Sequence, residues 1–471
     1  MKKVIIFTFF IILVSTSLQA QYPSENIKLL SHWNDSTIPL GSEHDSRFAG
    51  VWGYADTVKH KEYAILGSGS GSHFVEVTDP VNPLLRDFVP GRRDSCLWKE
   101  VKTYNNYAYV VSDDNGENSL QIVDMSYLPD SVHVVYDDTK LFITSHTIWV
   151  VGDKLYCGYV RKTGVVYSMA VYSLANPQLP LLLRTLNQDY PTIPSVHDMY
   201  VRNDTVYASC GFDGLYIFKL NSNNTFSMIG SLTSYPEKGY NHSTSLTNDG
   251  KTLIMCDEAP ASLAVKAVDI SDFGNISVTD LFRSVFYSKA TAHNPYVVGN
   301  DRVVVSYYTD GVQIFDISNP SNITRTGYFD TDTSSGFFNY WTPTYHGCWG
   351  AYPYLPSKIL LALDMQNGLY VLDPADAMQS HSDTIPKSLQ IKIYPNPSSA
   401  DILVEIDADK NYKLKYQITD VLGKLITENE LQLLQGKNGI SITANKITIG
   451  IYFFRLKGEK LNIIQKFAKD K

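Results

Sequence analysis

Histidines recur along the chain about 50 residues apart, and four of them are followed three positions later by a large aromatic residue. The four motifs are HTIW from 146, HDMY from 197, HNPY from 293 and HGCW from 346, and His242 holds the same position in another unit. Imidazole nitrogens can bind a metal ion or an anion, or act as a general base. The channel-mouth ligand candidates are therefore His146, His197, His242, His293 and His346.

One pair among these residues suggests catalysis. Asp198 follows His197 directly, and the two side chains could serve as a base and its orienting partner in a hydrolase or lyase. No G-x-S-x-G or comparable nucleophile motif accompanies them. The alternative is structural: an element repeated in nearly every unit is what a fold-building contact looks like, with the aromatic ring packed between units and the imidazole bonded to backbone.

An internal repeat positions these histidines. Seven segments end in similar phrases, among them LQIVDMS from 120, VKAVDISD from 265 and VQIFDISNP from 312, and their spacing is again about 50 residues. Regular spacing of this size is typical of stacked repeat folds. The chain therefore contains seven copies of one structural unit.

Each unit divides into short strands separated by turn residues. In the fourth unit DMYVR is followed by Asn203-Asp204, then TVYASCG, then Asp213-Gly214, then LYIFKL. Asp310-Gly311 and Asn367-Gly368 mark equivalent points of two other units. Such dipeptides favour tight hairpin turns with positive φ at both central residues. The pattern predicts an antiparallel meander of four strands in each unit.

The third strand of each unit is apolar at nearly every position, as in VQIFDI and LQIVDM, which indicates burial on both faces. Small sheets stacked face to face in a closed ring satisfy that requirement. We therefore predict an all-β chain with a seven-bladed β-propeller. The seventh unit lacks an outer strand, and the unused segment NIKLLSHWND at 26–35 is expected to supply it and close the ring.

In this arrangement each histidine opens the innermost strand of its blade, with Ala49 and Lys99 at the corresponding positions of the first two blades. Because residues i and i+3 point to opposite sides of a strand, ring and imidazole are expected to serve different surfaces. Seven sheets at the usual ~10 Å spacing give an inner circle of roughly 11 Å radius, an upper bound. Five imidazoles are not expected to meet at one ion, although neighbours such as His146 and His197 could; a hydrated channel mouth is favoured.

Other candidate sites are weaker. The aromatic segment from 336 to 354 offers Phe337, Phe338, Tyr340 and Trp341 for stacking on a sugar or a protein surface, or serves only as a cap on the seventh blade. The acidic segment SDDNGENS at 112–119 could hold Ca²⁺, and GSGSGS at 67–72 is a hairpin turn rather than a phosphate loop. We expect no cofactor, with Ca²⁺ or a transition metal as the alternatives.

Composition excludes several classes. The 471 residues are 44% hydrophobic and carry a net charge of −8 without a basic stripe, which argues against nucleic acid as a partner. Residues 1–20 resemble a secretory signal peptide, and no later segment is long and apolar enough to span a membrane. Five cysteines cannot all pair; Cys96 and Cys348 form the only plausible disulfide.

Beyond the propeller, assigned to 21–374, a polar linker at 375–390 precedes a small Ig-like β-sandwich at 391–471. The motifs IYPNPSS, ITDVLGKLI and GIYFFRL in this tail resemble the type A sorting domain of the type IX secretion system of Bacteroidetes-type cells. The residues that carry this resemblance are Tyr394, Pro395, Asn396, Pro397, Gly423, Lys424 and Gly450. The resemblance implies contact with the secretion machinery, and a secreted or surface-attached protein.

The propeller phrases resemble LVIVD repeats, and the layout is similar to the choice-of-anchor B family of exported propellers. YSLANP and LDPAD depart from the repeat, and the resemblance implies no catalytic residue. The function expected is a secreted or cell-surface binding module for a polysaccharide or protein. A hydrolase or lyase with a histidine-lined site at the channel mouth is the alternative from another class, and a purely structural adhesion scaffold is a third.

Overall fold

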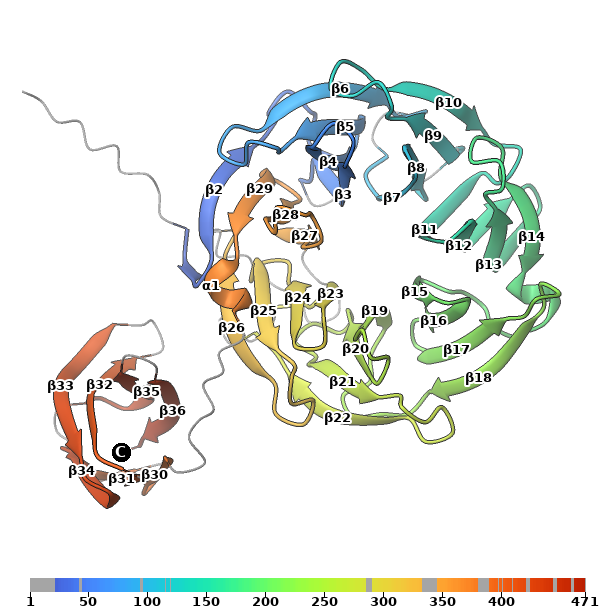
Figure 1. The fold of residues 1–471 in the computed structure, drawn as a ribbon. Coiled ribbons are helices and arrows are strands. Elements are labelled where there is room, and N and C mark those ends of the chain that lie inside the picture. The colour runs from blue at the N-terminus through green and yellow to red at the C-terminus, as the bar shows by residue number, and fades with distance from the viewer. Residues whose placement is uncertain are drawn as a thin grey trace, which may run out of the picture. The chain divides into compact units, whose positions relative to one another are not determined.

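The computed structural model describes residues 22–470, except 42–44, 94–95, 115, 119, 285–289, 333–344, 380–388, 397, 400, 409, 421–423, 444–446 and 459–460. The predicted signal peptide, residues 1–20, lies outside the described residues. The chain divides into two compact units, one ending at Gln379 and one beginning at Ser380. The first unit is a ring of seven small antiparallel sheets around a central channel (Figure 1).

The blades follow one another in chain order. Blade one contains β3 (Phe48–Asp56), β4 (Lys61–Ser68), β5 (Gly71–Glu76) and β6 (Leu84–Pro90). Blade two contains β7 (Lys99–Tyr104), β8 (Tyr107–Ser112), β9 (Leu120–Asp124) and β10 (His133–Asp138). Blade three contains β11 (Thr144–Val151), β12 (Lys154–Lys162), β13 (Val165–Ser173) and β14 (Leu181–Thr185), followed by the short 3₁₀ helix η1 (Leu186–Gln188).

Blade four contains β15 (Asp198–Arg202), β16 (Thr205–Ser209), β17 (Leu215–Leu220) and β18 (Phe226–Leu232). Blade five contains β19 (Asn241–Leu246), β20 (Thr252–Asp257), β21 (Val265–Asp269) and β22 (Ser277–Phe282). Blade six contains β23 (Asn294–Val298), β24 (Arg302–Ser306), β25 (Val312–Asp316) and β26 (Thr324–Phe329). Blade seven contains β27 (Cys348–Tyr352), β28 (Leu360–Asp364) and β29 (Gly368–Asp373).

The N-terminal chain closes the ring, as predicted. Strand β2 (Lys28–Trp33) pairs antiparallel with β29 and becomes the outer strand of blade seven. A second contact was not foreseen: β1 (Ser24–Glu25) pairs with β26, so that blade six has five strands. Ile27, between the two strands, is buried in the cluster shared by these blades. The N-terminal segment therefore fastens both sides of the seam.

Burial follows the sequence pattern in the third strands. In β9 and β25 every residue except the terminal aspartate is buried, which confirms coverage on both faces. The clusters between blades combine side chains of neighbouring sheets; one of them joins Ile254, Val265 and Ala267 of blade five to Val303 and Phe315 of blade six. Such interlocking faces hold each inner strand in place beside the channel.

The turns differ from the prediction in one respect. Asn203 and Asp204 both have positive φ, as a two-residue hairpin turn requires. In the Asp213-Gly214 turn only the glycine does, with φ +101, because the connection from β16 to β17 is a longer loop closed by Cys210 N–H on the Gly214 carbonyl. A Cβ on Gly214 would lie 2.7 Å from the Leu232 carbonyl oxygen, so glycine is required there.

The predicted linker begins later than expected. Residues Ala375–Met378 form a short helix, α1, whose Ala377 is buried against blade six beside Gly327. The amide of Ala377 also donates to the Asn26 carbonyl, next to the closing strands. The end of the first unit therefore packs against the seam of the ring.

The second unit is a two-sheet sandwich. One sheet contains β30 (Gln390–Tyr394), β31 (Ile402–Ala408) and β34 (Gly436–Ile442). The other contains β33 (Leu425–Leu433), β32 (Tyr412–Asp420), β35 (Gly450–Gly458) and β36 (Leu461–Lys469). Alternate residues of β31, namely Ile402, Val404 and Ile406, face the core that also contains Phe454 and Phe467. This alternation is typical of sheets covered on one face.

All five cysteines are buried and unpaired, so the Cys96–Cys348 pair, the one disulfide that the sequence left open, does not form. The two residues belong to different blades and have other partners. The Cys96 thiol donates to Asn118 Oδ1 at 2.9 Å, and Cys348 lies in β27, where burial raises its thiol pKa well above the usual range.

A buried carboxyl at the end of β28 predicts a pH dependence of stability. Asp364 is fully buried, and burial together with Asp332 raises its pKa to about 7. An unfolded aspartate has a pKa of about 3.9. The stability that the protonated Asp364 contributes is therefore fully present below about pH 4 and is lost as pH rises to about 7. We expect Asp364→Asn to reduce the loss of stability between pH 5 and pH 8, measured as the shift of the urea midpoint.

Asp79→Asn is the matched control, because Asp79 is exposed and its replacement should leave the pH profile unchanged. An Asp364→Asn profile parallel to that of the wild type would contradict the assignment of this titration to Asp364.

Candidate functional site

A cavity of about 180 Å³ lies in the channel at one face of the ring. Its lining comes from two kinds of position. Some lining residues lie just before an inner strand: Trp98, His197, His293 and Tyr345. Others follow a second strand: Asp113, Glu258 and Tyr308. In an antiparallel meander both positions lie at the same end of the blade. The repeat therefore delivers side chains from several blades to one place.

Four of the five predicted histidines meet there. Neighbouring ring centroids are 4.1 Å apart for His146 and His197, 4.5 Å for His197 and His242, and 4.3 Å for His242 and His293. Proximity had been left open for neighbours such as His146 and His197, and the structure extends it to a row of four rings in which each contacts the next. Blades taper toward the axis, so neighbouring inner strands lie closer than the ~10 Å sheet spacing that set the upper bound.

The first imidazole is paired with an acid. His146 Nδ1 lies 2.6 Å from Asp113 Oδ2. Burial disfavours the imidazolium, but Asp113 and, more weakly, Asp198 and Glu100 outweigh it and raise the pKa of His146 to about 9. A protonated His146 donates from Nδ1 to Asp113 and from Nε2 to His197 Nε2, which is 3.1 Å away.

The second imidazole is neutral. Burial and the neighbouring histidine charges hold the pKa of His197 well below its usual range. Because its Nε2 accepts from His146, its Nδ1 carries the hydrogen and donates to the Tyr240 hydroxyl at 3.0 Å. A continuous chain of hydrogen bonds thus runs from Asp113 to Tyr240.

Asp198 does not orient His197, contrary to the sequence-based pairing. Its Oδ1 accepts from the Thr147 hydroxyl at 2.8 Å and from the Met199 amide at 2.7 Å. Consecutive residues at the start of a strand point to opposite sides, which separates the two side chains. The acid that supports the histidine pair is Asp113, from a neighbouring blade.

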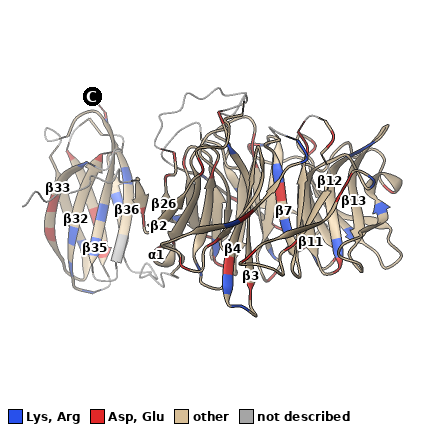
Figure 2. Cartoon of the chain, turned by 90° about the horizontal axis from the view of Figure 1, so that it is seen from above, with Lys and Arg blue, Asp and Glu red and all other residues tan. Residues whose placement is uncertain are grey.

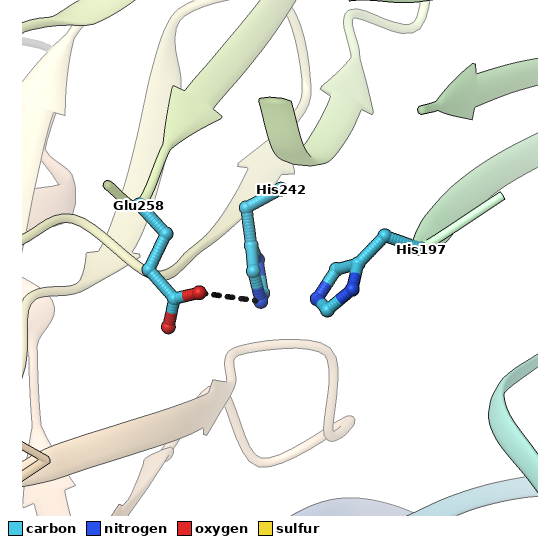
Figure 3. Close-up of side chains that lie close together, drawn as sticks. All are labelled: His197, His242 and Glu258. Carbon is cyan, nitrogen blue, oxygen red and sulfur yellow. Dashed lines mark ion pairs between the residues drawn. The ribbon is translucent and has the colours of Figure 1, made fainter. Parts of the chain in front are cut away.

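The third imidazole faces a carboxylate. His242 Nε2 lies 3.8 Å from Glu258 Oε2 (Figure 3). The other oxygen, Oε1, accepts from the Tyr308 hydroxyl at 2.8 Å. Among the described residues, His197, His242 and Glu258 form the group whose ligand atoms all lie within 4.8 Å of one another. These three side chains are the ones that could hold a metal ion.

The fourth imidazole packs on an aromatic ring. His293 Nδ1 donates to the Trp349 carbonyl, and the two rings lie 4.7 Å apart. Burial lowers the pKa of His293 well below its usual value. Trp349 also lines the cavity, where it packs on a histidine of the neighbouring blade and not on the histidine of its own motif. His346 lies two residues before β27 and is not among the residues that line the cavity.

Strand β7 replaces the histidine and aromatic positions with lysines, and Figure 2 shows charges of both signs along it. Lys99 is buried, lines the cavity and has its pKa lowered by burial to about 8. Lys102 pairs with Glu100 at 2.8 Å and lies 4.4 Å from the centre of the Trp52 ring. The charged residues of β7 therefore connect to the aromatic positions of blade one.

Sequence reasoning missed Glu258, Tyr240 and Tyr308, and it considered Asp113 only as part of a Ca²⁺ segment. Asp113 and Glu258 directly follow β8 and β20, the second strands of their blades. Aligning the seven units at the end of the second strand would have placed these acids beside the histidines. The predicted Ca²⁺ segment contains Asp113 and Asp114, whose carboxylates accept from His146 and from the Trp98 amide. The binding candidates Phe337, Phe338, Tyr340 and Trp341 lie outside the described residues.

The predicted sorting motif organises the second unit. Tyr394 ends β30, and the Asn396 side chain accepts from the Ala468 amide at 2.9 Å, which ties the following segment to β36. The Asp420 amide donates to the Lys424 carbonyl, the Lys424 amide donates to Asp420 Oδ1, and Gly450 begins β35. Pro395 follows Tyr394, and Pro397 and Gly423 lie outside the described residues.

Residues 392–470 match the family of secretion system C-terminal sorting domains. The C-terminal unit is a type IX sorting domain. The protein is consequently exported, and is either secreted or held at the cell surface. Among the described residues no helix has the length and apolar character needed to cross a membrane.

No curated protein matches the chain. Solved structures of low sequence identity do match the chain. PorZ, an essential bacterial surface component of the type IX secretion system of Porphyromonas gingivalis, is 12% identical with a TM-score of 0.38, over 87% of this chain and 64% of PorZ. A Bacteroides fragilis protein with a provisional 6-phosphogluconolactonase assignment is 12% identical with a TM-score of 0.46, over 85% of this chain and 99% of its own. A Lactobacillus plantarum protein is 11% identical with a TM-score of 0.47, over 84% and 99%.

Proposed function

We propose that the protein is an exported binding propeller that holds a terminal sugar residue of a polysaccharide in its axial cavity. The observation that carries this proposal is the lining of that cavity, where aromatic rings and hydrogen-bonding groups face one concave space. The resemblance of its phrases to LVIVD repeats and to the choice-of-anchor B family agrees with a surface-delivered binding role.

The aromatic part of the lining suits the flat face of a sugar ring. Trp98 and Tyr345 are partly exposed with ring centroids 5.6 Å apart, and Trp349 lies buried deeper. Aromatic side chains contribute area and geometry together in such contacts. Imidazoles and carboxylates around the same space provide directed partners for hydroxyl groups.

The cavity size favours a small group over a protein surface. At about 180 Å³ it is below the ~300–1,000 Å³ of pockets for drug-sized ligands, so it fits one sugar residue. A protein ligand would need a broad contact area, whereas Tyr345 and Trp349, from the described part of the aromatic segment at 336–354, line the small cavity itself.

The experiment is a glycan array with the mature full-length chain, followed by calorimetry on the best ligand. We expect Trp98→Ala to weaken binding about tenfold or more, because it removes one stacking face. Tyr127→Ala is the matched control, since Tyr127 is exposed on another part of blade two, where its ring stacks on His133. Failure to bind any glycan, or equal affinity of the two variants, would sink the proposal.

The second candidate is a hydrolase or lyase. The hydrogen-bonded chain from Asp113 through His146 to His197 favours it, because such a chain can deliver or remove a proton inside the cavity. Product analysis on the array ligand separates the two functions: binding without turnover supports the module, and turnover that is lost in His197→Ala supports the enzyme.

A further inference from the structure

We propose that His197, His242 and Glu258 bind a divalent transition metal ion at the inner end of the cavity. Binding of this ion does not depend on a glycan ligand. A transition metal was the alternative to the expectation of no cofactor, with neighbouring imidazoles and not all five as its ligands.

The geometry brings three ligand atoms together from two blades. His197 stands at the start of β15, His242 lies in β19, and Glu258 follows β20. Figure 3 shows the two imidazoles beside each other and the carboxylate directed at His242. Two ligands at ~2.0–2.1 Å from a tetrahedral ion lie roughly 3.3 Å apart, so the 3.8 Å between His242 Nε2 and Glu258 Oε2 needs only a small side-chain adjustment.

His146 is close enough to serve as a fourth ligand. His146 Nε2 lies 3.1 Å from His197 Nε2, close to the spacing of two nitrogens on one tetrahedral ion. Without an ion the two nitrogens share a proton; with an ion both could face the metal. Either His146 or a ligand in the cavity therefore completes the coordination.

Outer contacts hold the ligand side chains in place. Tyr240 bonds His197 Nδ1, Tyr308 bonds Glu258 Oε1, and Asp113 bonds His146 Nδ1. Partners of this kind fix the ring orientation and tautomer of histidines in metal sites. In each proposed ligand except His242, a protein group thus bonds one polar atom and leaves the other free to face the ion. His242 Nδ1 is buried and finds no partner among the described residues.

The surroundings select the class of ion. The cavity lining contains four carboxylates, Glu100, Asp113, Asp198 and Glu258, and one lysine, which favours a cation. Two or three imidazoles suit zinc and its neighbours, whereas Ca²⁺ and Mg²⁺ require oxygen ligands. Zn²⁺ is the ion that we expect to bind most tightly among abundant candidates.

The test uses untagged mature protein, stripped with a chelator and dialysed. Titration with Zn²⁺ alone should give one equivalent bound, and Co²⁺ alone should give the visible absorption of a four-coordinate site. We expect Glu258→Gln and His242→Ala each to weaken Zn²⁺ binding tenfold to a hundredfold. His133→Ala is the matched control, because His133 lies on the outer strand β10 and is exposed.

Glu258→Gln keeps the side-chain shape and an oxygen for the Tyr308 hydroxyl, so its fold should persist; a thermal melt of each metal-free variant checks this. Less than a tenth of an equivalent bound, or Glu258→Gln binding that equals wild type, would overturn the metal site. Loss of binding in His133→Ala as well would also overturn it. If the protein binds a glycan but no metal, the metal site fails and the sugar proposal holds. If it binds the metal but no glycan, the sugar proposal fails and the metal site holds.

Discussion

Deletion of residues 22–36 should lower the melting temperature of the propeller by about 10 °C or more, in one cooperative transition. The deletion removes β1 and β2 together with the buried Ile27 between them, and it leaves β26 and β29 as open edges. Each large apolar side chain lost from the core costs about 1.5–3 kcal/mol, and ring closure couples all seven sheets. Differential scanning calorimetry measures the effect.

Removal of residues 392–471 is the control for this deletion. That segment belongs to a separate compact unit, so the propeller transition should stay at the same temperature without it. An N-terminal deletion with an unchanged melt would show that the ring does not depend on its closing strand. The exposed edge of β29 is also expected to promote self-association, visible by light scattering.

Lys266→Met should lower the free energy of unfolding by about 3–5 kcal/mol. Lys266 Nζ lies 2.7 Å from Asp257 Oδ2, and both side chains are fully buried between strands of blade five. The substitution keeps much of the volume but leaves the Asp257 carboxylate in the core with no cation beside it, bonded only to neutral donors among the described residues: the Tyr235 hydroxyl, the Gly239 amide and the Asn241 side chain. Urea denaturation measures the change.

Lys140→Ala is the matched control, because water and salt screen the Lys140–Asp138 pair at the surface, so its loss should change the free energy of unfolding little. A Lys266→Met variant as stable as Lys140→Ala would mean that the buried pair adds nothing. Replacing Lys266 and Asp257 together by apolar residues should recover part of the loss, because no unpaired charge then remains.

The fold could be predicted because the same pattern of apolar strands and turn residues recurs in every blade. Continuous apolar third strands such as β25 indicate two covered faces, and the missing outer strand of blade seven points to the unused N-terminal segment. The pairing of β1 with β26 could not be foreseen. Two residues carry too little pattern to distinguish a strand from a loop.

The candidate site could be predicted only in part. The histidine register identified His146, His197, His242 and His293, because one position per blade recurs in sequence. Their mutual contact depends on how steeply the blades taper, which sequence spacing does not contain. Glu258 was missed because the units were aligned on their third strands, whereas Glu258 lies directly after the second strand of its blade.

The five unpaired thiols have a consequence for a protein that leaves the reducing cytoplasm. All five are buried, and burial raises the thiol pKa of Cys157, Cys210, Cys256 and Cys348, so little reactive thiolate forms. Folding thus protects the thiols from oxidants. They are open to oxidation only while the chain is exported and the ring has not yet formed.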